Sequence, residues 1–444
     1  MKKILLKTDQ NNPVIKAYVE AVKKGMPKRR DLKILWQSNS PSSGSGYSVF
    51  TRDLLFRLLK DGWNVECSGM GAGVDAYPIF MYGEDLIDDR FKGFKLKVYP
   101  KMHDPYGSDS LVFHGRESKA NAIFTMQDVW TLQPNDLSKL KTWLSYTPID
   151  KYPVPQNVIE KLQYAYKIIT FSKFGQKALE EKGFTSTLIL EGVDTEIFKP
   201  LNKQDLRKKF GIPQDVFLFG MIGANKENPP RKGYQEAIEA FALFQAKHEE
   251  AAIFFHTQQI TNTGFPIKQL CATLKLKNTL FLDDYRGSFN SRSHDIAEEI
   301  NCLDVLLHPS QTEGFGLLPV EAMACGIPAI VNDTTAAPEQ IIPGITGEIC
   351  KTDRHRFTPD AVWVWTADVQ DLYECMERLY DKLHKENTIA KDCRKHILKN
   401  YDIDKQFKEQ WIKLFEELQE EILPERRENG RPENKQSNIS NNRT

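Results

Sequence analysis

The chain has 444 residues, which exceeds what one hydrophobic core usually organises and predicts two or three domains. Hydrophobic residues make up 40% and charged residues 27%, a composition that excludes collagen-like, wholly disordered and disulfide-scaffold proteins. Sixty basic and sixty acidic side chains cancel, so no overall field draws the chain toward nucleic acid or an anionic membrane.

The charge is nevertheless unevenly distributed along the chain. Residues 1–30 form a basic N-terminal extension in which nine Lys and Arg side chains face only Asp9 and Glu20, a local charge of +7. Such a segment indicates either a solvated amphipathic helix or a contact with phosphate groups, on a membrane surface or a nucleic acid. Residues 424–444 contain one aliphatic side chain, Ile439, and we predict a disordered tail.

The cysteines and the hydropathy pattern indicate the compartment. The seven cysteines are odd in number and form no C-x-x-C pair, which favours a reducing compartment and offers no metal-ligand spacing. No apolar run approaches the ~18–20 residues of a membrane span. Asp9 follows the first apolar residues too soon for a signal-peptide core. We therefore predict a cytoplasmic protein without a transmembrane segment.

In the first half of the chain, short apolar runs alternate with helical patterns. The predicted strands cover residues 33–38, 63–67, 122–126, 143–147, 167–170 and 187–190. The predicted helices cover 48–60, 156–165 and 173–182, the last with Ser172 as N-cap. This alternation is typical of a doubly wound parallel sheet and predicts an N-terminal Rossmann-like domain over residues 31–198.

The same alternation restarts after a Pro- and Lys-containing join at residues 199–203. Predicted strands cover 216–222, 251–256, 279–282, 303–308 and 329–331, with helices over 234–247 and 319–325, and Gly326 ends the latter. A second α/β Rossmann-like domain is therefore predicted over residues 199–402. Long helical patterns at 369–385 and 404–422 follow, and a separate C-terminal helical segment is predicted over residues 403–423.

The strongest motif is EGFGLLPVEAMACGIP at residues 313–328, which follows a predicted strand and leads into a predicted helix. The amides of a Gly-bearing loop and a helix N-terminus together form an anion site that suits a diphosphate. Glu313 and Glu321 flank this loop. A carboxylate accepts paired hydrogen bonds from the vicinal hydroxyls of a sugar or ribose, although Glu321 could instead complement only the helix dipole.

Glu313 and Glu321, with seven residues between them, resemble the E-x7-E motif of the family-four (glycosyl transferases group 1) retaining glycosyltransferases. The resemblance implies the GT-B fold, two tandem Rossmann-like domains facing a cleft. It also implies that Glu321 binds the ribose of a nucleotide-sugar donor and that Glu313 lies beside the transferred sugar. The loop contacts with diphosphate and sugar then fall to Gly314, Phe315, Gly316 and Leu317. The resemblance further implies that the segment 403–423 packs back on the first domain, as the last helix does in the family.

A second cluster agrees with this resemblance. The strand 216–222 runs into a loop rich in cations, which places positive charge at the carboxyl end of the sheet, where α/β folds bind ligands. The family has an Arg and, six residues later, a Lys before a Gly, both on the donor diphosphate. Lys232 matches that Lys and is predicted to be catalytic. Lys226 replaces the Arg, so Arg231 could supply the bidentate geometry; the alternative is a solvated basic turn.

The loop after the first strand also resembles its counterpart in the family. Its small residues, among them Gly44 and Gly46, let the backbone approach a ligand closely. In the family this loop faces the donor phosphates and the acceptor, so Gly44 and Gly46 are assigned to the donor and Tyr47 to the acceptor side. An ordinary turn is the alternative.

Two aspartates follow strands of the first domain, where a carboxylate that positions an acceptor belongs. Asp128 is predicted to be catalytic, and Asp150 is placed on the acceptor side. Asp128 stands roughly where many relatives carry a His near the sugar. Glu191 likewise replaces the His of the family's H-G-V-D sequence. The acceptor chemistry is therefore where this chain departs from the family.

The remaining polar and aromatic candidates receive structural interpretations. Trp363 and Trp365 are read as core or interface aromatics. Adjacent Asp283 and Asp284 do not indicate a metal site, and we predict no metal and no cofactor. The histidines that flank apolar runs are interpreted as structural: His114, His256 and His308.

The predicted function is a retaining, metal-independent hexosyltransferase. It would move a sugar from a nucleotide-diphosphate sugar to a hydroxyl of a glycan, a lipid-linked or another acceptor. Three alternatives stay open. They are a nucleotide-sugar epimerase of the same architecture, a nucleic-acid glucosyltransferase suggested by the basic extension, and a non-catalytic sugar-nucleotide binding protein.

Overall fold

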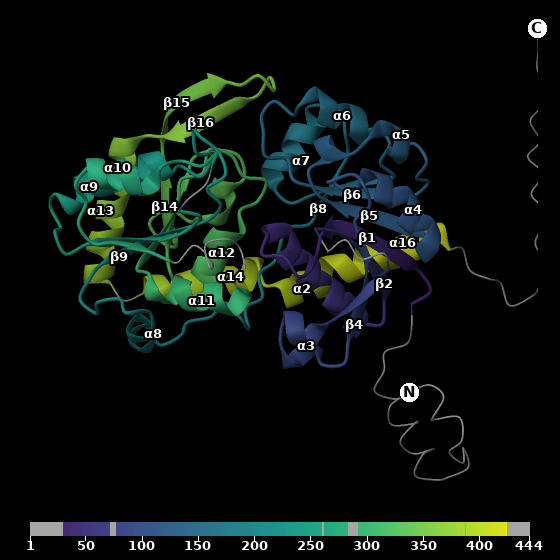
Figure 1. The fold of residues 1–444 in the computed structure, drawn as a ribbon, viewed down its shortest axis with the longest axis horizontal. Helices are drawn as coiled ribbons and strands as arrows, with labels where there is room; N and C mark the ends of the chain where they lie inside the picture. Colours follow the sequence, from purple (N-terminus) through teal and green to yellow (C-terminus); the bar gives the residue numbers. More distant parts are fainter. Residues whose placement is uncertain (1–29, 72–76, 260–261, 283–291, 387, 424–444) are drawn as a thin grey trace, which may run out of the picture.

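The computed structural model describes residues 30–71, 77–259, 262–282, 292–386 and 388–423. The predicted basic extension apart from Arg30, the predicted tail, and Asp283 and Asp284 lie outside the described residues. The described chain forms two α/β domains that lie side by side, each built around a largely parallel sheet (Figure 1).

Within the described residues, the first sheet has eight strands in the order β3-β4-β2-β1-β5-β6-β7-β8. Neighbouring strands are parallel except β3, which pairs antiparallel with β4, so the sheet is not the purely parallel one that the sequence predicts. The bounds are β1 (Lys33–Asn39), β2 (Asn64–Met70), β3 (Ile79–Tyr82), β4 (Lys95–Pro100), β5 (Ala122–Met126), β6 (Trp143–Thr147), β7 (Lys167–Thr170) and β8 (Thr187–Leu188).

Helices cover both faces of this sheet. They are α2 (Gly46–Lys60), α3 (Gly83–Leu86), η2 (Asp89–Phe91), α4 (Ser108–Ser118), η3 (Val129–Thr131), α5 (Pro134–Leu137), α6 (Gln156–Leu162) and α7 (Lys173–Glu180). The side chain of Ser172 accepts a hydrogen bond from the Gly175 amide, which confirms the predicted N-cap of α7. Ser45 caps α2 in the same way, and α2 therefore begins directly at the glycine loop that follows β1.

Among the described residues, the second sheet has six parallel strands in the order β11-β10-β9-β12-β13-β14. They are β9 (Leu218–Ile222), β10 (Ala252–His256), β11 (Thr279–Phe281), β12 (Val305–His308), β13 (Ala329–Asn332) and β14 (Gly347–Cys350). An antiparallel hairpin, β15 (Thr352–Phe357) and β16 (Trp363–Ala367), stands apart from this sheet and was not predicted. The helices are α8 (Lys203–Phe210), α9 (Tyr234–Gln245), α10 (Ile267–Thr273), α11 (Ser293–Cys302), α12 (Leu317–Ala324), η5 (Ala337–Gln340) and α13 (Val369–Lys385).

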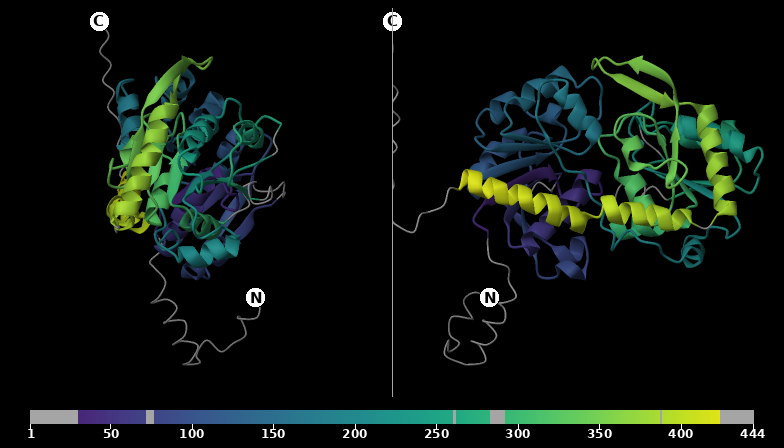
Figure 2. Two further views of the ribbon diagram at one scale, coloured as in Figure 1. Left: turned by 90° about the vertical axis from the view of Figure 1, so that its left-hand side faces the viewer. Right: turned by 180° about the vertical axis from the view of Figure 1, so that it is seen from behind.

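The last helices run from the second domain back across the first (Figure 2). They are α14 (Ile389–Asn400), α15 (Ile403–Gln406), the π-helical turn η6 (Phe407–Trp411) and α16 (Ile412–Ile422). The buried ring of Trp411 lies 5.8 Å from that of Trp36 on β1 and 5.1 Å from that of Tyr146 on β6, measured between centroids. The end of the chain therefore contributes to the core of the first domain.

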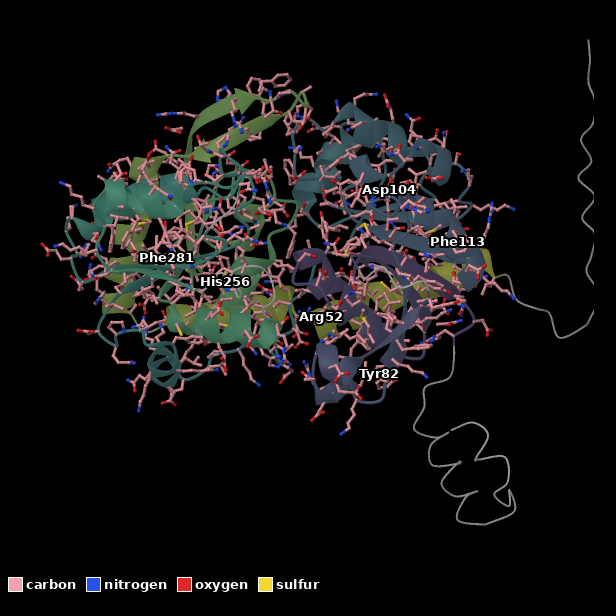
Figure 3. All side chains as sticks on the ribbon, in the orientation of Figure 1. Arg52, Tyr82, Asp104, Phe113, His256 and Phe281 are labelled. Carbon is pink, nitrogen blue, oxygen red and sulfur yellow. The ribbon has the colours of Figure 1, made fainter. Side chains whose placement is uncertain are left out.

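Polar contacts also join the domains at their junction. Arg52 of α2, labelled in Figure 3 where the two domains meet, donates a hydrogen bond to Ser293 of α11. The carboxylate of Glu339 accepts hydrogen bonds from the backbone amides of Lys173 and Phe174 at 2.9 and 2.5 Å, so a residue of the second domain caps α7 of the first.

Gly233 lies where two loops of the second domain come into close contact. It adopts φ +70° before α9, and a Cβ at this position would lie 2.2 Å from the carbonyl oxygen of Pro309. Gly211 has a similar φ of +67°, but no described atom lies within 4 Å of its Cβ position. We expect Gly233→Ala to lower the free energy of unfolding by about 2–5 kcal/mol, from backbone strain and overpacking together.

Gly211→Ala is the matched control and should lower that free energy by about 1–2 kcal/mol, from backbone strain alone. Urea unfolding of both variants checks the difference. Equal losses would mean that the loops carrying Gly233 and Pro309 are not in close contact.

Candidate active site

The E-x7-E loop lies at the carboxyl end of β12, next to β9 in the middle of the second sheet. Gly316 ends the loop at φ +90°, and α12 begins at Leu317. The side-chain amide of Gln340 donates hydrogen bonds to the carbonyls of Phe315 and Gly316, at 2.8 and 3.0 Å. Thr335 Oγ1 accepts the Glu313 amide at 2.8 Å. Hydrogen bonds from the side chains of Gln340 and Thr335 thus fix the backbone of the loop.

Glu313 is the centre of a charged cluster. Its Oε1 lies 2.6 Å from Lys232 Nζ, 3.1 Å from His308 Nε2 and 3.6 Å from Arg231 Nη1. Burial by itself would raise the pKa of the Glu313 carboxyl, but the charges of Lys232 and Arg231 outweigh it and hold the pKa well below its usual range. Glu313 is therefore ionised at neutral pH, and its negative charge lies next to two cations.

The cation loop between β9 and α9 positions these partners. Arg231 Nη1 donates a hydrogen bond to the Thr312 carbonyl at 2.6 Å, which ties the cation loop to the E-x7-E loop. Lys226, by contrast, is exposed, and its carbonyl accepts a hydrogen bond from Thr263 Oγ1. The structure thus shows Lys232 and Arg231 as cations in contact with Glu313.

Glu321 is buried at the junction of the two domains, and only 6% of the residue is exposed. Burial raises the pKa of its carboxyl to about 8; the nearby Asp53 raises it further and Arg52 opposes the shift. Because α12 begins at Leu317, Glu321 falls in the second turn rather than the predicted first, which disfavours a role limited to the helix dipole. Its neighbours Arg52 and Asp53 belong to α2 of the other domain.

The first-domain candidates converge on the same place. Burial raises the pKa of Asp128 to about 6, together with the charge of Asp150, while Arg231 and a hydrogen bond from Tyr47 oppose the shift. Burial also raises the pKa of Asp150, which Arg231 opposes and Glu313 adds to. Arg231 of the second domain therefore interacts with both aspartates of the first, and the structure brings the predicted acceptor and donor residues together.

The E-x7-E loop and the start of α12 also approach two segments of the first domain, the start of α2 and the loop after β6. A Cβ on Gly46 would lie 3.4 Å from Leu317 Cδ1, and one on Gly314 would lie 2.6 Å from Pro148 Cβ. Gly44 is half-buried in the loop between β1 and α2. Phe315 turns its side chain into the core, 5.9 Å from the Tyr401 ring, so only its backbone is available for the predicted ligand contact.

Sequence reasoning missed two residues of this cluster. His308 was interpreted as structural, yet it contacts Glu313; His114 and His256 instead bond to Ser68 and Glu299 within the two domains. Glu191 is 4% exposed, and burial, followed by the charges of Glu313 and Glu321, raises its pKa to about 8. The signal for Glu191 was its replacement of the family's His.

Neither a membrane-spanning helix nor a metal-binding cluster occurs in the part of the chain that the structure describes. There, no helix combines the length and apolar character needed to span a membrane. In the same residues, no group of three or more His, Cys, Asp or Glu side chains is arranged to hold a metal ion.

Comparison with known proteins finds similarity chiefly in the second domain. Residues 202–358 match the family Glycosyl transferases group 1. The N-acetyl-alpha-D-glucosaminyl L-malate synthase of Bacillus anthracis is 27% identical over 159 residues, 36% of this chain and 38% of that protein. The lipopolysaccharide core biosynthesis mannosyltransferase LpsB of Rhizobium meliloti is 27% identical over 189 residues, 41% of this chain and 51% of that protein. The matches thus span about two fifths to one half of these relatives.

Solved structures extend the similarity to both domains. Sucrose-phosphate synthase from Thermosynechococcus elongatus has a TM-score of 0.68 at 17% identity, covering 87% of this chain and 99% of that one. Anabaena HepE in complex with UDP-glucose has a TM-score of 0.65 at 18% identity, covering 87% and 100%. The predicted GT-B fold is confirmed, and residues 202–358, which include the E-x7-E motif, match the model of the Glycosyl transferases group 1 family.

The raised pKa of Glu321 predicts a pH dependence of stability. Its pKa is about 8 in the folded protein against 4.5 ordinarily, so between these values the folded state binds more protons than the unfolded state. The stability contributed by this group is full below pH 4.5 and is lost as pH rises through 8, by at most about 1.4 kcal/mol per pH unit. Glu321→Gln should remove this loss and gain stability relative to the wild type at pH 8.

Urea unfolding at pH 5 and pH 8 measures the effect, with Glu417→Gln on the exposed face of α16 as the control. A wild-type-minus-variant difference that stays constant with pH would show that Glu321 ionises normally in the folded protein.

Proposed function

We propose that this protein is a retaining, metal-independent glycosyltransferase that moves a sugar from a nucleoside-diphosphate sugar to a hydroxyl of an acceptor. One observation carries the proposal: buried Glu313 contacts Lys232 and Arg231, and the charge of Arg231 in turn lowers the pKa of Asp128 and Asp150 in the other domain. The structurally similar HepE of Anabaena forms a complex with UDP-glucose, which supports a nucleotide sugar as the donor of this protein.

The donor would bind mainly to the second domain. Its diphosphate suits the amides of the E-x7-E loop, the N-terminus of α12 and the cations Lys232 and Arg231. Negative charge grows on the diphosphate as the sugar leaves, and groups held in place beforehand stabilise that charge most effectively. Glu321 would accept hydrogen bonds from the ribose hydroxyls. Its buried position means that it must ionise as the donor binds.

The acceptor would bind mainly to the first domain. Asp128, with its pKa raised to about 6, has a proton affinity suited to orienting or deprotonating a hydroxyl near neutral pH. Tyr47 bonds to the same carboxylate and would fix its orientation. The ionised Glu313 would lie beside the transferred sugar, where a negative charge stabilises an oxocarbenium-like centre.

The experiment has three arms. UDP- and GDP-sugars are incubated with glycoside acceptors, and proton NMR follows the anomeric signal; a retained anomer with nucleotide release is the expected product. Donor without acceptor tests the epimerase alternative, since epimerised donor would contradict the transferase. The same transfer in EDTA tests metal independence, and a loss of activity restored by Mg²⁺ or Mn²⁺ would contradict it. Donor binding without turnover would favour the non-catalytic alternative.

Asp128→Asn tests the acceptor role. The variant keeps the size and the hydrogen-bonding capacity of the side chain but removes its basicity, so transfer should fall by ~10²-fold or more with donor affinity unchanged. Transfer rate, donor dissociation constant and melting temperature are measured on the same preparation. Asp85→Asn, on the exposed helix α3, is the control and should leave all three unchanged.

A different outcome would change the role assigned to Asp128. Full transfer activity together with a lowered melting temperature would make Asp128 a residue that only supports the turn after β5.

A further inference from the structure

A hollow of about 330 Å³ lies beside the candidate active site and is lined by both domains. Tyr152, Phe174, Lys177 and Glu181 contribute from the first domain, and Thr335 and Trp365 from the second. Neither Glu321 nor Lys232, the residues assigned to the donor, lines it among the described residues. The hollow is therefore a separate compartment from the proposed donor site.

Two links connect this hollow to the reacting groups. Thr335 lines it and accepts the Glu313 amide at 2.8 Å through its Oγ1. Tyr152 follows Asp150 by two residues, on the same stretch of chain after β6. A molecule in the hollow would thus lie next to the site where Glu313, Asp128 and Asp150 meet.

The β15–β16 hairpin fixes the two walls against each other. It reaches from the second domain toward the first (Figure 1), and the Trp363 amide donates a hydrogen bond to the Tyr152 carbonyl at 2.7 Å. Lys151 Nζ also lies 3.4 Å from Asp360 Oδ2 on the turn of the hairpin. The hairpin therefore brings Trp365 to the same hollow as Tyr152 and Phe174, so that both domains contribute aromatic rings to it.

The chemistry of the lining suits a sugar ring. Tyr152 remains 40% exposed although its backbone is bound to the other domain, and Trp365 is half-buried. Aromatic faces of this kind pack against the apolar C–H face of a pyranose. Lys177, Glu181 and Thr335 provide both donors and acceptors for its hydroxyls, the usual combination in a ligand pocket.

We infer that this hollow binds a second sugar ring of the acceptor, next to the ring that carries the reacting hydroxyl. The inference rests on the proposed function and deepens it, because it makes the acceptor an oligosaccharide or a glycoside with at least two rings. Specificity for that second ring then depends on Trp365 and Tyr152, which the E-x7-E resemblance does not assign.

The test measures sugar binding directly and does not require turnover. Saturation-transfer NMR compares maltose, cellobiose, lactose and α-1,3-mannobiose with the corresponding methyl monoglycosides, in the presence of UDP or GDP. At least one disaccharide should bind about tenfold more tightly than its monoglycoside. Trp365→Ala and Tyr152→Ala should each remove that preference; the second leaves the backbone bond to Trp363 intact.

Phe113→Ala, on α4 and 50% exposed, is the control and should keep the preference. Trp130→Ala tests a competing site, because this exposed ring follows Asp128 by two residues and lies 5.7 Å from Tyr106. Loss of the preference only in Trp130→Ala would overturn the inference. So would the absence of any disaccharide preference, or a weakened nucleotide affinity in Trp365→Ala, which would assign the hollow to the nucleobase.

The outcomes separate this inference from the proposed function. Nucleotide binding and sugar transfer without any effect of Trp365→Ala or Tyr152→Ala would overturn the second-ring site alone. A disaccharide preference that depends on Trp365, in a protein that neither binds nucleotides nor transfers sugar, would support the sugar site and remove the transferase.

Discussion

The contact between Lys232 and Glu313 is the interaction on which the rest of the site depends. It joins the loop after β9 to the loop after β12, the two adjacent strands whose carboxyl ends form the centre of the second sheet. A buried ion pair is stabilising only when its geometry is good and further polar contacts support it. Arg231 and His308 add such contacts to Glu313 Oε1, the same atom that Lys232 contacts, and Gly233 lets the two loops approach closely enough for the pair to form.

The second constraint is the arrangement of the domains. Asp128 and Asp150 interact with Arg231 only because the first sheet is held against the second. Arg57 of α2 contributes to this arrangement, since its guanidinium binds Asp194 at 2.9 Å and Asp404 of α15 at 2.8 Å. The aromatic core around Trp411 does the same, since the Trp411 ring also packs against Phe50 of α2. The residues of the site thus come from both domains, and the packing of the last helices determines where the two domains meet.

The sequence predicted the elements that a continuous apolar run in the chain marks. The strands β5, β6 and β7 are fully or almost fully buried apolar runs, and their predicted bounds agree with the structure. The β15 strand carries charged side chains and is exposed along nearly its whole length, so no hydrophobic pattern indicated it. Strand β3 is short and at the edge of its sheet, and its antiparallel pairing follows from neighbours that a local pattern does not reveal.

The same distinction applies to the site. Motif spacing and the family resemblance that it carries singled out Glu313, Glu321 and Lys232 as candidate site residues, because these residues lie in short continuous segments of the chain. The contact of His308 with Glu313 and the burial of Glu191 arise from packing between segments, which sequence spacing does not encode. The exposure of Lys226 and the inward turn of Phe315 are further consequences of packing, and they limit how literally a family motif transfers to a chain.

The most direct test of the account is the affinity for UDP and GDP, measured by calorimetry on the wild type and on Lys232→Ala. Lys247→Ala, an exposed change just after α9, is the control. The account predicts that the wild type binds at least one of the two nucleotides. It further predicts that Lys232→Ala weakens this binding at least tenfold while the control leaves it unchanged, because a charge-assisted contact with the diphosphate is lost. Equal affinities in the wild type and Lys232→Ala would contradict the assignment of the Lys232–Glu313 cluster as the donor site.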